Sequence, residues 1–171
     1  MTDQRLERNP IALLGELLAT EEKTTDMLER LVGKQIFVRV LSQQTTGRTI
    51  HRESVLYSEE LPYIVSHNFV VIDSEQIPRQ LHELIAIKKI GIGKAMNQLE
   101  LASSRHVCTY GWIKKDNVVD FEGNYSDLQC VQGEQFIPFK RYSITFRPFN
   151  RPGMRLIEYF NPILIHTREE W

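Results

Sequence analysis

The segment Thr49-Ile-His-Arg-Glu-Ser-Val-Leu56 carries the alternation of apolar and polar residues that decides this fold. Alternate residues of a β-strand share one face, so Arg52 would project on the same face as Ile50. Met154-Arg-Leu-Ile-Glu-Tyr-Phe160 repeats the pattern near the other end of the chain and places Glu158 on an apolar face. A charge on such a face costs free energy unless another side chain or a ligand pairs with it. The partner of each charge is therefore the central functional question.

The chain on either side of this segment predicts further strands of an antiparallel sheet. Besides the strand with Arg52, five runs are predicted as strands: 35–41, 63–72, 107–113, 142–146 and 154–160. The first three strands in the chain, separated by polar turns at 43–47 and 59–62, are typical of a meander. Asn150-Arg-Pro-Gly153 predicts a hairpin turn between the last two.

Four helices are predicted around these strands. Asn9-Pro10 favours the start of the first, because Asn suits the N-cap and Pro the first helical position. Thr24 or Thr25 can cap the second. Pro78 opens the third, and Gly91-Ile-Gly93 separates it from the fourth. Helices packed on an antiparallel sheet indicate an α+β protein.

Composition limits the classes of function. The chain has 171 residues and no internal repeat or linker, so we expect a single domain spanning 1–171. The net charge of −1 gives no overall attraction to nucleic acid or to anionic membranes, although a local basic pocket remains possible. No signal peptide or apolar run of roughly 18 residues is found, which predicts a cytoplasmic protein. The polar stretch 114–134 is expected to be a long, solvated excursion.

Familiar metal and phosphate motifs are absent from the sequence. The five histidines show no paired spacing, and Cys108 and Cys130 have no metal-ligand spacing, so no metal site is predicted. Gly91-Ile-Gly-Lys94 lacks the preceding glycine and the following Ser or Thr of a phosphate loop. A helix start next to glycine nevertheless offers free N–H groups to an anion, and Ile92 or Gly93 could bind a carboxylate in this way.

Arg52 and Glu158 allow two interpretations. They could form a salt bridge between strands, or reach water at strand ends. Alternatively, they could bind a ligand: the planar guanidinium of Arg52 suits a carboxylate, and Glu158 could accept a hydroxyl proton or act as a general acid or base. Residue types alone leave both interpretations open.

A family resemblance rests on four ordered motifs. They are Leu17-Leu18 followed by Thr24-Thr-Asp-Met-Leu-Glu29, His51-Arg-Glu-Ser-Val-Leu56, Lys89-Ile-Gly-Ile-Gly-Lys94 and Leu156-Ile-Glu-Tyr-Phe-Asn-Pro162. In this order and spacing they resemble the chorismate pyruvate-lyase family, including its archaeal and actinobacterial branch. The resemblance implies a highly twisted antiparallel sheet of about six strands, with helices covering an enclosed ligand pocket.

The resemblance also implies an activity, the splitting of chorismate into 4-hydroxybenzoate and pyruvate by a carbon–oxygen lyase without a cofactor. Arg52 would hold a ligand carboxylate, and Glu158 would contact the ring 4-hydroxyl. The backbone at Ile92, and at Thr24 or Thr25, would complete the carboxylate pocket. Glu158 would assist proton movement near C4 or would position the hydroxyl. The partner would be a small molecule, with no nucleic acid and no membrane.

His67 stands where bacterial members of the family carry a second arginine, and a histidine can still donate to a carboxylate. Two other functions remain open. Effector-binding domains of some bacterial transcription regulators are similar in fold, so the chain could sense an aromatic acid without catalysis. Residues 1–34 are too short for the winged helix-turn-helix that precedes such domains, which favours the enzyme. The other open function is that of an interaction protein with an internal Arg–Glu salt bridge and no ligand.

Overall fold

The computed structural model describes residues 10–165 of the chain. Asn9, predicted as the cap of the first helix, lies outside these residues. Four α-helices are present: α1 (Pro10–Ala19), α2 (Thr24–Val32), α3 (Arg79–Ala86) and α4 (Ile92–Gln98). Short 3-10 turns occur at Ser74–Gln76, Lys115–Asn117 and Pro162–Ile165.

Six strands form one sheet in the order β1-β2-β3-β6-β5-β4. Every neighbouring pair is antiparallel. The strands are β1 (Phe37–Thr46), β2 (Thr49–Tyr57), β3 (Ile64–Asp73), β4 (Ser103–Lys114), β5 (Phe136–Phe146) and β6 (Met154–Phe160). The predicted α+β class and antiparallel sheet are confirmed.

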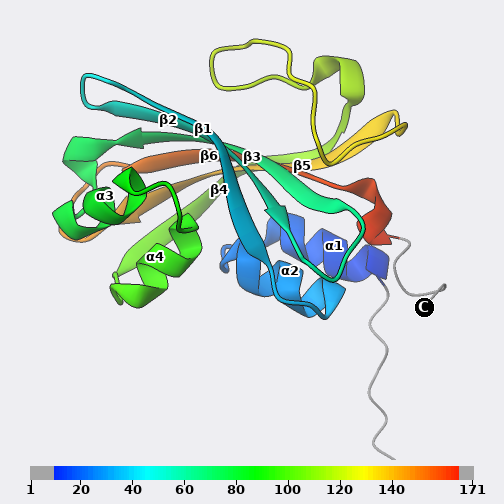
Figure 1. Ribbon diagram of the computed structural model, residues 1–171, viewed down its shortest axis with the longest axis horizontal. Coiled ribbons are helices and arrows are strands. Elements are labelled where there is room, and N and C mark those ends of the chain that lie inside the picture. Colours follow the sequence, from blue (N-terminus) through cyan, green and yellow to red (C-terminus); the bar gives the residue numbers. More distant parts are fainter. Residues whose placement is uncertain (1–9, 166–171) are drawn as a thin grey trace, which may run out of the picture.

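All four helices cover one face of the sheet, and the segment 115–135 lies over the other face (Figure 1). The helices form two groups: α3 and α4 pack over one half of the sheet, and α1 and α2 over the other half. Each group buries its own apolar cluster against the strands. The face beneath the helices therefore has a boundary between two cores, and that boundary is where a pocket can form.

The strands depart from the prediction at their ends. β1 continues through the expected turn at 43–47, and the chain reverses only at Gly47, whose φ of +59° favours glycine. β4 and β5 extend well beyond 107–113 and 142–146 because they pair with each other from Ser103 to Lys114. β4 is an edge strand with little burial, so it lacks the apolar alternation that would predict its length.

The excursion after β4 is more structured than predicted. It contains the turn Lys115–Asn117 and an isolated bridge between Val119 and Tyr125. Val118 and Leu128 pack with Tyr159 in a third apolar cluster on the far face of the sheet. The segment therefore covers the sheet rather than extending into solvent.

Candidate functional site

A pocket lies under the helices, at the boundary between the two helical groups. Residues from all six strands and from the starts of α2 and α4 line it. The cavity volume is about 70 Å³. These dimensions suit one small molecule.

Arg52 lies at one end of the pocket with part of its guanidinium unpaired. Arg52 is only 3% exposed, and its Nη2 donates a hydrogen bond to the carbonyl of Ile90 at 2.6 Å. Nη1 is buried and has no hydrogen-bond partner within residues 10–165. Burial lowers the pKa of Arg52 to about 10, so the side chain stays charged at neutral pH. A buried cation with an unused donor is suited to an anionic ligand.

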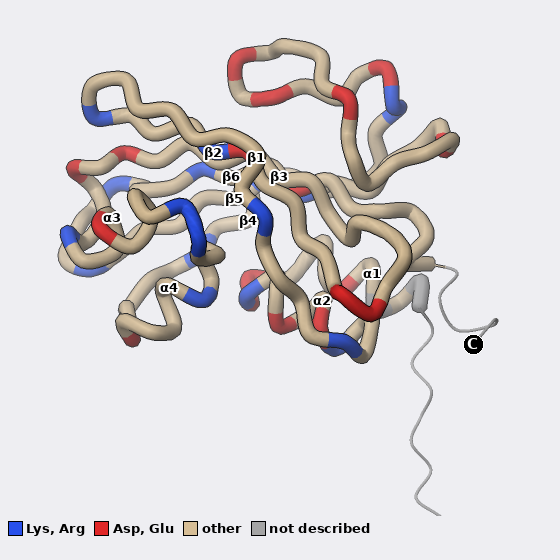
Figure 2. Tube along the Cα trace, viewed as in Figure 1, with Lys and Arg blue, Asp and Glu red and all other residues tan. Residues whose placement is uncertain are grey.

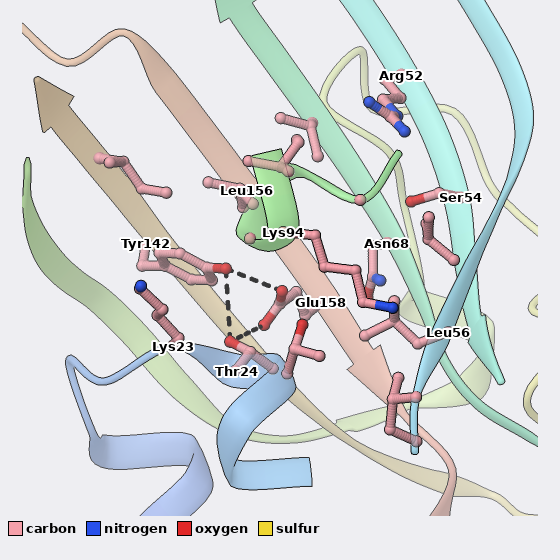
Figure 3. A pocket seen from close by; sticks show the side chains of 18 of the residues that line it. Lys23, Thr24, Arg52, Ser54, Leu56, Asn68, Lys94, Tyr142, Leu156 and Glu158 are labelled. Carbon is pink, nitrogen blue, oxygen red and sulfur yellow. Dashed lines mark hydrogen bonds between the residues drawn. The ribbon is translucent and has the colours of Figure 1, made fainter. Parts of the chain in front are cut away.

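Glu158 lies at the other end, where both carboxylate oxygens accept hydrogen bonds. Thr24 donates to Oε2 at 2.8 Å, and the hydroxyl of Tyr142 donates to Oε1 at 2.9 Å (Figure 3). Burial raises the pKa of Glu158, and the nearby Lys140 ammonium opposes this shift. Burial also raises the pKa of Tyr142, so its hydroxyl remains a donor. Each carboxylate oxygen has a second lone pair that a ligand hydroxyl can use.

Arg52 and Glu158 face the same pocket but do not pair with each other. The register aligns Arg52 with Val70 on β3 and Leu156 on β6, and Glu158 is two residues beyond Leu156. With strands about 4.8 Å apart and a rise of about 3.4 Å per residue, their Cα atoms are roughly 12 Å apart. Each side chain has other hydrogen-bond partners, and within residues 10–165 no ion pair joins the two. The pocket thus has two separate polar ends.

Two helix starts meet at the mouth of the pocket. Thr24 and Thr25 begin α2, Ile92 and Gly93 begin α4, and all four residues line the pocket. A Cβ built on Gly93 would lie 3.6 Å from Thr25 Oγ1, which shows how closely the two starts approach. The first N–H groups of a helix have no acceptor within that helix and can bind an anion. The structure therefore brings together Arg52, Glu158 and the four predicted backbone positions.

His67 is the predicted site residue that the structure does not bring to the pocket. Asn68, the next residue along β3, faces the pocket, so His67 projects to the opposite face of the sheet. There His67 Nε2 lies 2.7 Å from Glu53 Oε1, and Nδ1 accepts from the N–H of Gln129 at 3.0 Å. The prediction that His67 binds a ligand carboxylate in the pocket is therefore wrong, because the side chain lies on the opposite face of the sheet. There it attaches the 115–135 segment to the sheet.

Several pocket residues were missed by sequence reasoning. Cations predominate: Lys23, Arg52, Lys94 and Arg105 line the pocket, against the one carboxylate of Glu158. Figure 2 shows acidic residues along the loop on the far face of the sheet. Lys94 was visible in the glycine-rich turn, but Arg105 lies on an edge strand with no apolar alternation. The pocket is therefore basic in a chain whose overall charge is −1.

Neither a metal site nor a membrane span is found in the described part of the chain. Between residues 10 and 165, no three His, Cys, Asp or Glu residues gather as metal ligands would. No helix in that range is long and apolar enough to cross a bilayer. The pocket's donors are hydroxyl, ammonium, guanidinium and amide groups, which suit an organic anion.

Comparison with known proteins adds one sequence relative and several structures. No family model matches the chain. The chain is 26% identical over 149 residues to "Putative lyase MJ0807" of Methanocaldococcus jannaschii, covering 84% of this chain and 75% of that protein.

Among solved structures, the fold is similar to PhnF from Mycobacterium smegmatis, with a TM-score of 0.55 at 8% identity. That match covers 84% of this chain and 65% of the PhnF chain, less than two thirds of its length. The effector domain of PhnF alone also matches with a TM-score of 0.55 at 9% identity, and here the match covers 82% of this chain and 88% of the domain. The twisted antiparallel sheet with helices on one face is accordingly the chorismate lyase-like fold, which this chain shares with the effector domain of PhnF.

Proposed function

We propose that the chain is a chorismate pyruvate-lyase, which eliminates pyruvate from chorismate to give 4-hydroxybenzoate. One observation carries the proposal: a buried arginine with an unpaired donor and a buried glutamate occupy opposite ends of one small, basic pocket. A ring acid with a hydroxyl opposite its carboxylate would match both ends.

The ring carboxylate would bind at the Arg52 end. Nη1 of Arg52 supplies a charge-assisted hydrogen bond, which is among the stronger hydrogen bonds in proteins. Nη2 is already held by the carbonyl of Ile90, two residues before the start of α4. The guanidinium therefore lies beside the segment that leads to the amides of Ile92 and Gly93.

The ring hydroxyl would bind at the Glu158 end. Thr24 and Tyr142 hold the carboxylate from two directions, so it needs little rearrangement when a ligand arrives. Because burial raises its pKa, the carboxylate is a stronger proton acceptor than an exposed glutamate. It can therefore orient the 4-hydroxyl and assist removal of the proton at C4.

The chemistry needs few protein groups. The bond between C3 and the ether oxygen breaks, its electron pair stays on that oxygen, and the C4–H electrons form the new ring double bond. Aromatisation provides the driving force, and the enolpyruvate released takes up a proton to become pyruvate. The cations Lys23, Lys94 and Arg105 would stabilise the leaving carboxylate, which is the electrostatic contribution expected of such a site.

A sensing domain is the second candidate, and the structural comparison favours it. The chain matches most of the effector domain of PhnF in fold. Thr24 and Tyr142 fix Glu158 in a way that would equally suit a receptor that holds an aromatic acid without turning it over. The name of the M. jannaschii relative supports the lyase instead.

Incubation of the purified chain with chorismate tests the lyase directly. Product is followed as 4-hydroxybenzoate by chromatography and as pyruvate by a coupled dehydrogenase assay, with heat-denatured protein as the background. We expect equal amounts of both products, formed well above the uncatalysed rate. No product above background would reject the lyase for this substrate. A rise in melting temperature with 4-hydroxybenzoate, without turnover of chorismate, would indicate the sensor.

A further inference from the structure

Asn68 lies on the floor of the pocket between its two polar ends. On β3 it is the direct partner of Glu158 on β6 and of Ser54 on β2. Arg52 is on the same face of β2, two residues before Ser54. Figure 3 shows Asn68 between Arg52 and Glu158. A ligand that spans the two ends would therefore pass over this amide.

The side-chain oxygen of Asn68 has no hydrogen-bond partner within the described residues. The residue is 5% exposed, and its Oδ1 is buried without a hydrogen bond. A side-chain amide carries two donors and an acceptor, and nearly all such groups are paired when they are buried. An unpaired amide oxygen in the wall of a pocket indicates that a ligand supplies the partner.

Its position in the sheet determines which part of the ligand it meets. Asn68 is directly opposite Glu158 but only diagonal to Arg52, so it is closer to the hydroxyl end than to the carboxylate end. We infer that Asn68 binds a polar substituent on the ring carbon next to the hydroxyl-bearing carbon. This inference rests on the proposed function, and it defines the ligand class as ring acids with two adjacent oxygen substituents.

In the proposed lyase, the second oxygen is the ether oxygen of the leaving group. The ether oxygen carries no proton, so the contact comes from Nδ2 of Asn68, which donates to it while the bond to C3 breaks and the electron pair moves onto that oxygen. A hydrogen bond that strengthens as this charge develops lowers the barrier. In a sensor, the same contact would select among aromatic acids.

Three benzoates separate this inference from the proposed function. 4-Hydroxybenzoate has only the carboxylate and the hydroxyl, 3,4-dihydroxybenzoate adds the adjacent oxygen, and 4-hydroxy-3-methylbenzoate adds a group of similar size that cannot form a hydrogen bond. Affinities are measured by titration calorimetry. We expect the wild-type chain to bind the dihydroxy acid at least about tenfold more tightly than the methyl acid, the difference expected of one buried hydrogen bond.

Two variants test the residue itself. N68L keeps the approximate volume without polarity, and N68S keeps polarity without the reach. In both we expect the preference for the dihydroxy over the methyl acid to fall to about twofold or less. Melting temperatures close to wild type confirm that each variant is folded, and either folded variant is sufficient.

The outcomes are distinguishable. A preference that is absent from the wild type, or that persists in a folded variant, overturns the inference and leaves the proposed function intact. Asn68-dependent binding of the dihydroxy acid without any binding of 4-hydroxybenzoate supports the inference but rejects the proposed product. If none of the three acids binds, the inference is rejected, and the turnover of chorismate decides the proposed function separately.

Discussion

The chemistry of this protein depends on very few side chains. Arg52 and Glu158 are the charges that the sheet buries under the helices, together with Lys140, whose ammonium donates to the carbonyls at the end of α1. Lys140 thus has a structural partner. Arg52 keeps an unpaired donor, and Glu158 keeps free lone pairs beside the pocket. A buried charge whose hydrogen-bonding groups are paired within the protein has a structural role, whereas a buried charge with unused hydrogen-bonding capacity is available to a ligand.

Substitution of either charge should disable the proposed reaction. R52A removes the cation that binds the ring carboxylate, and E158Q removes the proton acceptor. Each is expected to lower kcat/KM for chorismate by at least about a hundredfold, the usual effect of losing a positioned acid–base or electrostatic group. Initial rates of 4-hydroxybenzoate formation provide the measurement.

R48A and E60Q serve as matched controls, since both residues are exposed and form only surface ion pairs. They should retain rates close to wild type. Rates near wild type in both R52A and E158Q would remove the two residues from the mechanism.

Sequence reasoning found these two charges because a buried strand alternates strictly, so a charge on the apolar face is conspicuous. The same reasoning missed Asn68 and Tyr142, which are polar but uncharged and did not interrupt the pattern. It misplaced His67 because a family position was transferred without checking which side of the strand it occupies. The apolar residues of β3 occupy both faces of the strand, Phe69 on the side of His67 and Val70 on the side of Asn68, so the sequence of this strand alone does not place His67.

Among the elements, the turn between β5 and β6 packs closely against the segment that follows β3. A Cβ on Gly153 would lie 2.3 Å from the carbonyl oxygen of Gln76, which is backbone and cannot move aside easily. The N–H of Gly153 also bonds to Ile144, and its carbonyl accepts from Asp73. The turn thus attaches the end of β3 to the start of β6.

We expect G153A to destabilise the protein by about 1–3 kcal/mol, the usual cost of overpacking. Urea unfolding followed by circular dichroism measures the change. G15A is the matched control: nothing lies within 4 Å of the added methyl group, and Gly15 is inside α1. Alanine is better than glycine in a helix by up to about 1 kcal/mol, so this variant should be slightly more stable. Equal stability of the two variants would contradict the close contact at Gly153.

The sequence predicts which segments form helices and which form strands, but it does not predict the full length of every strand. Helices α1 to α4 and the central strands follow from apolar periodicity and from the positions of glycine and proline. The expected cap at Thr24 or Thr25 is wrong, because Lys23 is the N-cap of α2 and its side chain forms no capping hydrogen bond. The edge strand β4 does not follow from periodicity, since neither of its faces is fully buried. Its length is determined by pairing with β5, a long-range contact that local sequence does not encode.

At the scale of the whole molecule, the sheet separates two kinds of structure. One face carries the helices and the basic pocket, and the other carries the 115–135 segment, which His67 attaches through Gln129. Burial lowers the pKa of His67, while its hydrogen bond to Glu53 opposes the shift. In the folded state His67 is therefore harder to protonate than in the unfolded chain.

This difference predicts a pH dependence of stability. Where the folded pKa is lowered, the unfolded state binds more protons below the ordinary value near 6.5, so acidification favours unfolding. The contribution of His67 is complete above about pH 7 and is lost as the pH falls through about 6.5 towards the folded pKa. Urea unfolding from pH 7.5 to 5.5 should show a steeper loss of stability in the wild type than in H67Q. H106Q, at an exposed histidine, should follow the wild type. Identical slopes in wild type and H67Q would refute this role.

The long segment could not be foreseen as a cover for the sheet. Its residues are mostly polar, and the few that pack against the sheet, such as Val118 and Leu128, are spaced without a helix or strand period. Their burial depends on the far face of the sheet, which is formed by residues distant in the chain.

Consecutive residues of β2 serve the two faces of the sheet: Arg52 faces the pocket, and Glu53 holds His67 on the far side. Deleting one residue from this strand would turn the side chains on one side of the deletion to the opposite face of the sheet. The protein would then lose either the cation proposed to bind the ligand or the residue that holds His67 and the 115–135 segment. In proteins that descend from this one, insertions and deletions should therefore occur in the hairpin turns and in 115–135, and selection should remove them from β2. The spacing of this strand would be inherited more strictly than the identity of most of its residues.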